Sequence, residues 1–267
     1  MRLVTFDGGV GEPLDGKIRV FDAPSMIDWL AGGGHEEARV VPAESVTLRA
    51  PVPEPPSIRD FFAFEGHVAA GWRRRGGEIP PYWYQAPVFY FSNPASIIGP
   101  GDPVQRPDGC EWLDFELEIA AVIGGDGGIA GFTLMNDWSA RDIQAGEMSV
   151  GLGPAKAKDF ATSLGPWLVT PDELPYEGGR LDLRATVAVN GEVVSECDAS
   201  QQHWTWDEIV EQAGRNTRLR PGDILGSGTL TGGCILELGI DWLKDGDVVT
   251  LAAPGLGELT NAVGEGS

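Results

Sequence analysis

The sequence predicts a β-rich α+β fold in which short strands outnumber helices. Glycine and proline supply 38 and 20 of the 267 residues, and such a composition favours many turns over long helices. Apolar residues alternate over 112–124, as they do in a strand with one buried face. The pair Asn190-Gly191 stands between two alternating segments, which is a strong hairpin signal. Sheets joined by tight turns are therefore expected to dominate the structure.

The first 50 residues are predicted to form a small N-terminal domain. Residues 1–25 indicate two short strands around a turn-rich segment, and Ser25 can cap a short helix that reaches Leu30. Four prolines follow within residues 51–56, and proline-rich stretches make stiff connectors. We therefore place a domain boundary near residue 50.

The rest of the chain, 51–267, is predicted to be one domain of catalytic size. Thr205 followed by Glu208 forms a capping box, which marks the start of a short helix. From residue 220 onward, Pro-Gly-Asp and Asp-Gly-Asp turns separate short strands. The other expected elements are a helix or two short helices over 57–73, strands over 112–124 and 129–137 with a turn at 125–128 between them, the hairpin at 190–191, and a helix over 206–214.

Charge and composition exclude several classes of function. Forty acidic residues against 19 basic ones give a formal net charge of −21, and such a surface repels nucleic acids and anionic membranes. The three cysteines are too few for a disulfide framework, and their wide spacing matches no zinc-ligand motif. The N-terminus lacks the apolar run of a signal peptide, and no stretch reaches the roughly 18 apolar residues of a membrane helix. We expect a soluble, cytoplasmic protein.

The predicted strand at 112–124 carries acidic side chains on one face. Its other face is wholly apolar, whereas Glu116 and Glu118 point the same way, about 6–7 Å apart along the strand. An ordinary solvated face would explain this pattern. However, the two like charges repel each other, and no lysine or arginine lies within the strand to offset them. A divalent cation would remove the repulsion, and oxygen ligands suit Mg²⁺, Mn²⁺ or Ca²⁺ rather than zinc.

Two further segments contain candidate functional residues. The segment Asn-Asp-Trp-Ser-Ala-Arg-Asp-Ile-Gln at 136–144 follows an apolar strand, and Asp137 is either a third metal ligand or a helix cap. His67 lies between aromatic and small residues, seven positions after Asp60. A lone histidine is more often structural than catalytic, so both interpretations of His67 stay open at this point.

These segments, in this order, form a pattern that resembles the fumarylacetoacetate hydrolase family, over roughly residues 55–265. One Glu-x-Glu motif would be weak evidence, whereas an ordered set over two hundred residues is specific. The pattern consists of Asp60 and His67, Glu116-Leu117-Glu118, the segment 136–144, Lys158 in Ala-Lys-Asp-Phe, Gly165-Pro166-Trp167, and the segments 226–233 and 255–261.

The resemblance implies a mixed β-roll fold, a homodimer, a role in the breakdown of aromatic compounds, and a set of site residues. Two departures put the substrate in doubt: Ala-Lys-Asp-Phe replaces the usual Gly-Lys-Ser-Phe, and the N-terminal part is shorter than in fumarylacetoacetase. The implied roles are metal ligation by Asp60, Glu116, Glu118 and Asp137; water activation by His67, oriented by Glu237; contacts of Arg141, Gln144 and Lys158 with the substrate oxygens and the leaving carbanion; and binding of a substrate carboxylate by Thr229.

Such a family member is expected to hydrolyse a carbon–carbon bond in a 1,3-diketo acid or acylpyruvate, with Mg²⁺, Mn²⁺ or Ca²⁺ as cofactor. The two substrate oxygens can chelate one cation, and a neutral histidine can take a proton from the attacking water. A decarboxylase, isomerase or hydratase, such as a 2-hydroxyhepta-2,4-diene-1,7-dioate isomerase, would use the same metal site without the water attack. A non-catalytic binding module is the third alternative, and it would need neither His67 nor Lys158.

Overall fold

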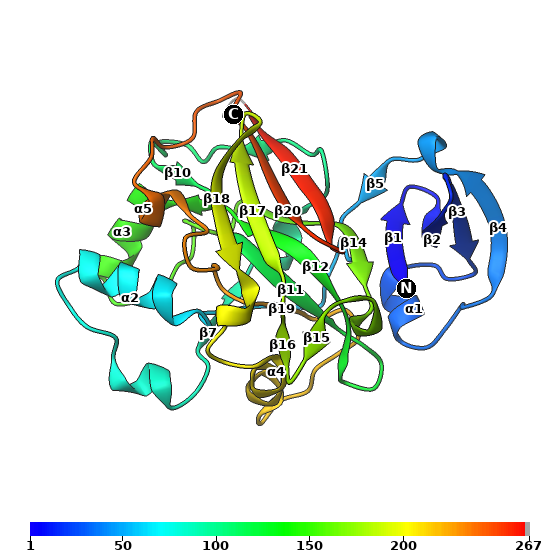
Figure 1. Cartoon of the computed structure of the whole chain (residues 1–267), viewed down its shortest axis with the longest axis horizontal. Helices are drawn as coiled ribbons and strands as arrows, with labels where there is room; N and C mark the ends of the chain where they lie inside the picture. Colours follow the sequence, from blue (N-terminus) through cyan, green and yellow to red (C-terminus); the bar gives the residue numbers. More distant parts are fainter. Residues whose placement is uncertain (265–267) are drawn as a thin grey trace.

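Two β-sheets form the framework of the molecule, which the computed structural model describes over residues 1–264 (Figure 1). The larger sheet contains twelve strands. Off its main path, β5 (Leu48–Arg49) pairs with β1 and β8 (Ile97–Ile98) pairs with β14. The main path runs in the order β4 (Glu37–Pro42), β3 (Lys17–Phe21), β2 (Gly9–Leu14), β1 (Arg2–Phe6), β14 (Thr162–Val169), β12 (Ile129–Asp137), β11 (Leu117–Ile123), β19 (Ile224–Gly226), β6 (Ile58–Phe61) and β7 (Phe89–Ser92).

The second sheet has five strands, and two short pairs accompany it. Its order is β18 (Glu192–Asp198), β17 (Arg184–Val189), β20 (Val248–Ala253), β21 (Gly257–Gly264) and β9 (Val104–Gln105). The short pairs are β10 (Leu113–Asp114) with β13 (Ser139–Ala140), and β15 (Tyr176–Glu177) with β16 (Arg180–Leu181).

The helices are short, so the predicted β-rich α+β class is confirmed. Figure 1 shows α2, α3 and α5 grouped at one side of the sheets, away from the N-terminal strands. Among the described residues, no helix has both the length and the apolar character needed to cross a membrane. The α-helices are α1 (Met26–Leu30), α2 (Glu65–Arg74), α3 (Arg141–Ser149), α4 (Trp206–Gly214) and α5 (Ile235–Leu238), and single 3₁₀ turns occupy Ala43–Ser45, Pro81–Tyr84, Pro94–Ser96, Pro171–Glu173 and Ala199–Gln201.

The N-terminal segment contains more strands than the sequence suggested. Residues 2–21 form three strands instead of two, whereas Ser25 caps α1 as predicted, because its side chain accepts the Asp28 N–H. The segment lies at one side of the molecule (Figure 1). Its strands continue the larger sheet through β1, in which Leu3 pairs with Leu168 of β14. The division into domains 1–50 and 51–267 stays a prediction.

The strand predicted at 112–124 is present in two pieces, β10 and β11. Its predicted apolar face is buried in the largest core cluster, in which Leu117, Ile119 and Phe115 are at most 2% exposed. The turn at 125–128 then leads into β12, which pairs with β11 in antiparallel register. This hairpin lies near the centre of the larger sheet and carries the acidic residues Glu118 and Asp137.

The helical prediction for 57–73 is wrong over its first part. Ile58–Phe61 is β6, which pairs in parallel with β19 and in antiparallel register with β7, and all four of its residues are buried. Pairing on both sides satisfies the backbone of a buried segment, and this tertiary effect overrides mixed local polarity. The helix α2 begins only at Glu65.

The local turn and cap signals are confirmed. Asn190 and Gly191 have φ values of 53° and 82°, as a two-residue hairpin turn between β17 and β18 requires. Thr205 and Glu208 form the predicted capping box at the start of α4, with both reciprocal hydrogen bonds present. The short helix α5, by contrast, was not anticipated.

Candidate active site

Three buried carboxylates meet at neighbouring strands of the larger sheet. Asp60 lies in β6, Glu118 in β11 and Asp137 at the end of β12, and each is at most 3% exposed. One oxygen of each lies within 4.8 Å of the other two. The strand order produces this meeting, because β12 pairs with β11 and only β19 lies between β11 and β6.

A glycine in β19 makes room for these side chains. A Cβ atom added at Gly226 would lie 2.6 Å from Asp60 Oδ1 and 3.0 Å from Glu118 Oε2. Both distances are shorter than ordinary van der Waals contact, so any larger residue would push the carboxylates apart. The close approach of the three acids therefore depends on a glycine at this position.

The carboxylates of Asp60 and Glu118 are poorly neutralised by the protein itself. Burial raises the pKa of both Asp60 and Glu118 well above its usual range, and neighbouring carboxylates raise it further. Burial also raises the pKa of Asp137. Asp60 Oδ1, Glu118 Oε1 and Asp137 Oδ1 are buried without a hydrogen-bond partner, which is costly for polar atoms. A hard divalent cation takes oxygen ligands of this kind, so the three side chains fit one.

Glu116, the fourth predicted ligand, has cationic partners instead. Its carboxylate accepts a hydrogen bond of 2.6 Å from Arg141 Nη2 and another from Lys158 Nζ. Although burial opposes it, these two cations lower the pKa of Glu116 below its usual range. Lys158 also donates to Asp137 Oδ2 and thus connects Glu116 with the three-carboxylate cluster. The ligand role of Glu116 stays a prediction.

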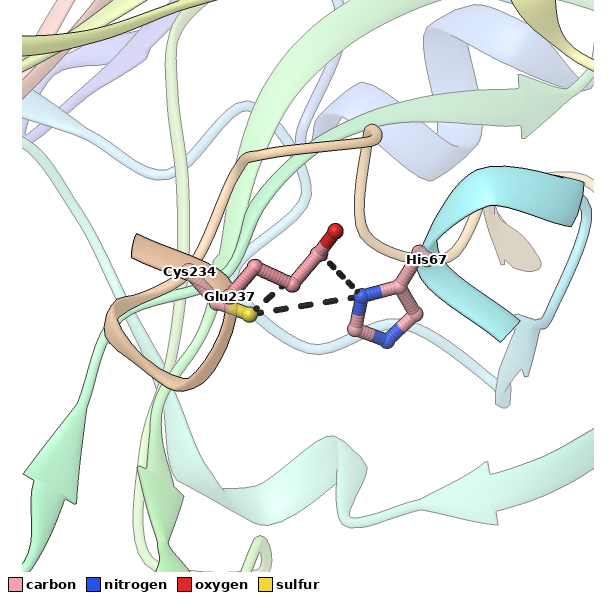
Figure 2. Close-up of side chains that lie close together, drawn as sticks. All are labelled: His67, Cys234 and Glu237. Atoms are coloured by element: carbon pink, nitrogen blue, oxygen red, sulfur yellow. Dashed lines mark hydrogen bonds and ion pairs between the residues drawn. The ribbon is translucent and has the colours of Figure 1, made fainter. Parts of the chain in front are cut away.

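His67 and Glu237 form a hydrogen-bonded pair between α2 and α5. Figure 2 shows the His67 ring with Nδ1 directed at the Glu237 carboxylate, 2.6 Å from its Oε1, and with Nε2 on the other side of the ring. His67 Nε2 lies 4.0 Å from Glu116 Oε1. The Gly232 N–H donates to Glu237 Oε2 at 3.1 Å, which fixes the carboxylate. The pairing that the resemblance implied is therefore present as a contact.

Asp114 connects the helices α3 and α5 through hydrogen bonds. Its carboxylate accepts hydrogen bonds from Arg141 Nε at 2.8 Å and from the backbone N–H of Ile235 at 2.7 Å. Arg141 begins α3 and also donates to Gln144 Oε1 at 3.0 Å, while Ile235 begins α5. Asp114 belongs to the predicted strand at 112–124, but the sequence analysis assigned it no function.

A cavity of about 230 Å³ lies over these groups. Eight of the ten predicted site residues line it, and Asp137 and Glu237 are not among the lining residues. An apolar wall offers room for the carbon chain of a ligand; it includes Phe62, Val88, Phe89, Met148 and Leu236. The predicted residues on the lining are Asp60, His67, Glu116, Glu118, Arg141, Gln144, Lys158 and Thr229.

Among the lining residues that sequence reasoning missed, Tyr90 and Arg75 have polar side chains. The Tyr90 hydroxyl donates to Asp137 Oδ2 at 2.6 Å, and burial raises its pKa well above the usual range. Arg75 follows α2 and lines the cavity near Met148. The aromatic run Phe89-Tyr90-Phe91 did not indicate a site, because aromatic residues are equally typical of a structural strand.

Comparisons with known proteins point to one family. A family model described as fumarylacetoacetate (FAA) hydrolase C-terminal matches residues 57–264. Fumarylacetoacetase from Arabidopsis thaliana is 33% identical over 271 residues, covering 72% of this chain and 63% of the plant protein. The chain thus spans less than two thirds of that relative.

Solved structures extend the likeness to nearly the whole chain. The 5-carboxymethyl-2-hydroxymuconate delta-isomerase from Mycobacterium smegmatis is 26% identical, with a TM-score of 0.77 and coverage of 99% of this chain and 100% of the other. The 2-hydroxyhepta-2,4-diene-1,7-dioate isomerase from Mycobacterium marinum is also 26% identical, with a TM-score of 0.74 and coverage of 99% and 98%. The fold that the resemblance implied is therefore confirmed.

Proposed function

The chain belongs to the fumarylacetoacetate hydrolase family, and we propose that it is a divalent-metal-dependent hydrolase that cleaves a carbon–carbon bond in a 1,3-diketo acid or acylpyruvate. The observation that carries this proposal is the pairing of two features in one cavity. Three buried carboxylates with unpartnered oxygens adjoin a histidine whose Nδ1 is held by a second carboxylate. Together they supply a cation site and a base.

Asp60, Glu118 and Asp137 would hold the cation, and we propose Glu116 as a further ligand or as the link to Lys158. A bound Mg²⁺, Mn²⁺ or Ca²⁺ would act as a Lewis acid toward the substrate oxygens. The orphaned oxygen atoms of the three carboxylates support this assignment. These three metals are proposed on the basis of ligand type, because all three accept oxygen ligands.

His67 would act as the general base. Its Nδ1 donates to Glu237, so its Nε2 is free to accept a proton from water. The hydroxide so formed would attack a substrate carbonyl carbon. Glu237 would hold the imidazole in this tautomer and stabilise the imidazolium that results.

The cationic side chains would stabilise the negative charge that develops on the substrate. Breaking the carbon–carbon bond leaves an enolate, and the buried ammonium of Lys158 is held near the cluster by Asp137 and Glu116. Although burial opposes it, these carboxylates raise the pKa of Lys158, so it stays charged. Arg141 and Gln144 would contact the substrate oxygens, and Thr229 would bind the substrate carboxylate. Donors aimed at developing charge contribute several kcal/mol to catalysis.

An isomerase or decarboxylase on the same site is the second candidate. The observation in its favour is that the two solved structures described above, each 26% identical to this chain, carry isomerase names. Neither reaction needs an activated water, so the His67–Glu237 pair favours hydrolysis. The experiment is to incubate the Mg²⁺-loaded protein with acylpyruvates, diketo acids and oxaloacetate and to quantify pyruvate, released acid and CO₂. Acid release supports the proposal, whereas CO₂ or an isomer alone contradicts it.

The location and assembly of the protein are also proposals. We propose that it works as a homodimer in the cytoplasm, in the breakdown of aromatic compounds. The absence of paired cysteines among the described residues is compatible with a reducing compartment. The dimer rests on the family resemblance and is tested in the Discussion.

A further inference from the structure

The cluster of His67, Cys234 and Glu237 contains three different metal-binding atoms at short range. Among the described residues, two clusters bring three such donors within 4.8 Å of one another: the carboxylates described above and this mixed set. Figure 2 shows that the Cys234 sulfur and the Glu237 carboxylate both face Nδ1 of His67. This cluster could not be recognised from the sequence, because Cys234 lies 167 positions from His67.

The distances within the cluster are close to those around a tetrahedral cation. Donor atoms bound to one zinc ion lie roughly 3.3–3.8 Å apart, given zinc–ligand bonds of roughly 2.0–2.3 Å. Here Cys234 Sγ lies 3.5 Å from Glu237 Oε1 and 4.0 Å from His67 Nδ1, and the His67–Glu237 contact is 2.6 Å. Only that last contact must widen, by roughly 1 Å, for a cation to enter.

The cluster is accessible from the cavity. His67 lines the cavity, and the side chains of His67 and Glu237 are each about 10% exposed. Cys234 is fully buried beneath them, and its sulfur has no contact with solvent. A cation that arrives through the cavity would therefore meet the His67 imidazole before it meets the buried sulfur.

We propose that His67, Cys234 and Glu237 form an inhibitory site for a thiophilic divalent cation such as Zn²⁺ or Cd²⁺. A mixed sulfur, nitrogen and oxygen set favours such ions over Mg²⁺, which prefers oxygen ligands. The binding step releases one proton, from the Cys234 thiol, while the ring hydrogen of His67 moves from Nδ1 to Nε2 and frees Nδ1 for the cation. The two cation sites of the cavity thus differ in the class of metal that they select.

Occupancy of this site would stop the base from working. A neutral imidazole that binds a metal through Nδ1 carries its hydrogen on Nε2, so Nε2 no longer accepts a proton from water. Glu237 is at the same time removed as the partner of the imidazole. Inhibition therefore rests on the proposed hydrolase mechanism, whereas binding of the cation does not.

The test uses Cd²⁺ as the probe, added to full-length protein kept in excess Mg²⁺. Thiolate–cadmium charge-transfer absorption reports a Cd–S bond, and an acylpyruvate assay reports turnover in the same samples. Wild type, Cys234→Ser and the control Cys197→Ser are compared; Cys197 is a second buried thiol, next to Ser195. Circular dichroism verifies that each variant is folded.

We expect the absorption band and inhibition in wild type and Cys197→Ser. In Cys234→Ser the band should vanish and the inhibition constant should rise, by at least the roughly 10–100-fold that loss of a supporting partner costs a metal site. A band that persists in Cys234→Ser, or its absence from wild type, overturns the proposal. Equal inhibition of all three proteins also overturns it, since Cd²⁺ would then act at the carboxylate cluster.

A measurement on the wild type alone guards against a misfolded variant. X-ray absorption at the cadmium edge distinguishes a site with a sulfur neighbour from one with oxygen and nitrogen only. A sulfur neighbour supports the proposed site, and an all-oxygen shell contradicts it. Neither result depends on turnover, so failure of this inference is distinguishable from failure of the proposed hydrolase function.

Discussion

Charge is unevenly distributed among the four acidic side chains of the cavity. Glu116 is neutralised by Arg141 and Lys158, whereas Asp60 and Glu118 face each other without an adjacent arginine. The pKa of Glu116 is accordingly lowered, and the pKa values of the other two are raised, chiefly by burial. At the scale of single residues, Asp60 and Glu118 are therefore the carboxylates whose charge a bound cation would neutralise, whereas Glu116 and Asp137 already contact Lys158.

Replacement of Glu118 with alanine should weaken cation binding. We expect calorimetric affinity for Mg²⁺ or Mn²⁺ to fall at least about tenfold, because a charged ligand is lost from a small set. Glu111→Ala is the matched control, since Glu111 is exposed and carries the same charge. Unchanged binding by folded Glu118→Ala protein would refute the assignment of this residue.

His67 and Glu237 should behave as one unit. We expect His67→Ala to reduce hydrolysis by roughly 10²–10⁴-fold, as loss of an acid–base group does. Glu237→Gln should cost less, because a neutral amide can still hold the imidazole. The double variant should be no slower than His67→Ala alone, since residues of one unit are not additive. Kinetic losses that multiply in the double variant would show two independent roles.

At the scale of elements, the short helices α2 and α5 carry His67 and Glu237, and strands carry the three clustered carboxylates. The helix α5 has only four residues, and its start is held by Asp114, which accepts the backbone N–H groups of Ile235 and Leu236. The same carboxylate holds Arg141 at the start of α3. The position of Glu237 opposite His67 thus depends on a buried acid rather than on helix propensity.

The capping box of α4 offers a test of local stability away from the site. Thr205→Ala removes the side-chain acceptor of the Glu208 N–H, so we expect the free energy of unfolding to fall by about 1 kcal/mol. Thr205→Ser keeps a hydroxyl and should lose much less. Denaturant titration of the two variants checks this, and equal stabilities would count against the cap.

The sequence predicted those elements whose signals are local. The capping box at Thr205, the Asn190-Gly191 turn and the buried face of 112–124 all appear in the structure, because backbone dihedrals and side-chain alternation determine them. The strand β6 was missed because its pairing with β19 joins distant parts of the chain. The mixed cluster at Cys234 was missed for the same reason, since spacing along the chain says little about it.

The candidate site could be predicted only in part. Glu116 and Glu118 were singled out from their shared strand face, but alternation alone does not show that the two have different partners. Asp114 shares that face, and its contact with α5 depends on an element that the sequence did not reveal. The partners of buried charges come from distant segments, so the fold must be known before they can be assigned.

At the scale of the whole molecule, the chain has a formal net charge of −21, whereas its cavity contains a buried lysine and a buried arginine. The predicted homodimer belongs to this scale. We expect light scattering at micromolar concentration to give twice the mass of one chain. A mass of one chain across the concentration range used for activity would contradict the dimer.

The reaction class is tested most directly by following the oxygen of water into the product. The Mg²⁺-loaded protein is given an acylpyruvate in water labelled with heavy oxygen, and the released acid is analysed by mass spectrometry, with a chelated sample and His67→Ala as controls. Hydrolysis by activated water predicts one labelled oxygen in the newly formed carboxylate, and much less product in both controls. Turnover that leaves every carbon–carbon bond intact, or that releases only CO₂, would contradict the hydrolase assignment and favour the isomerase or decarboxylase.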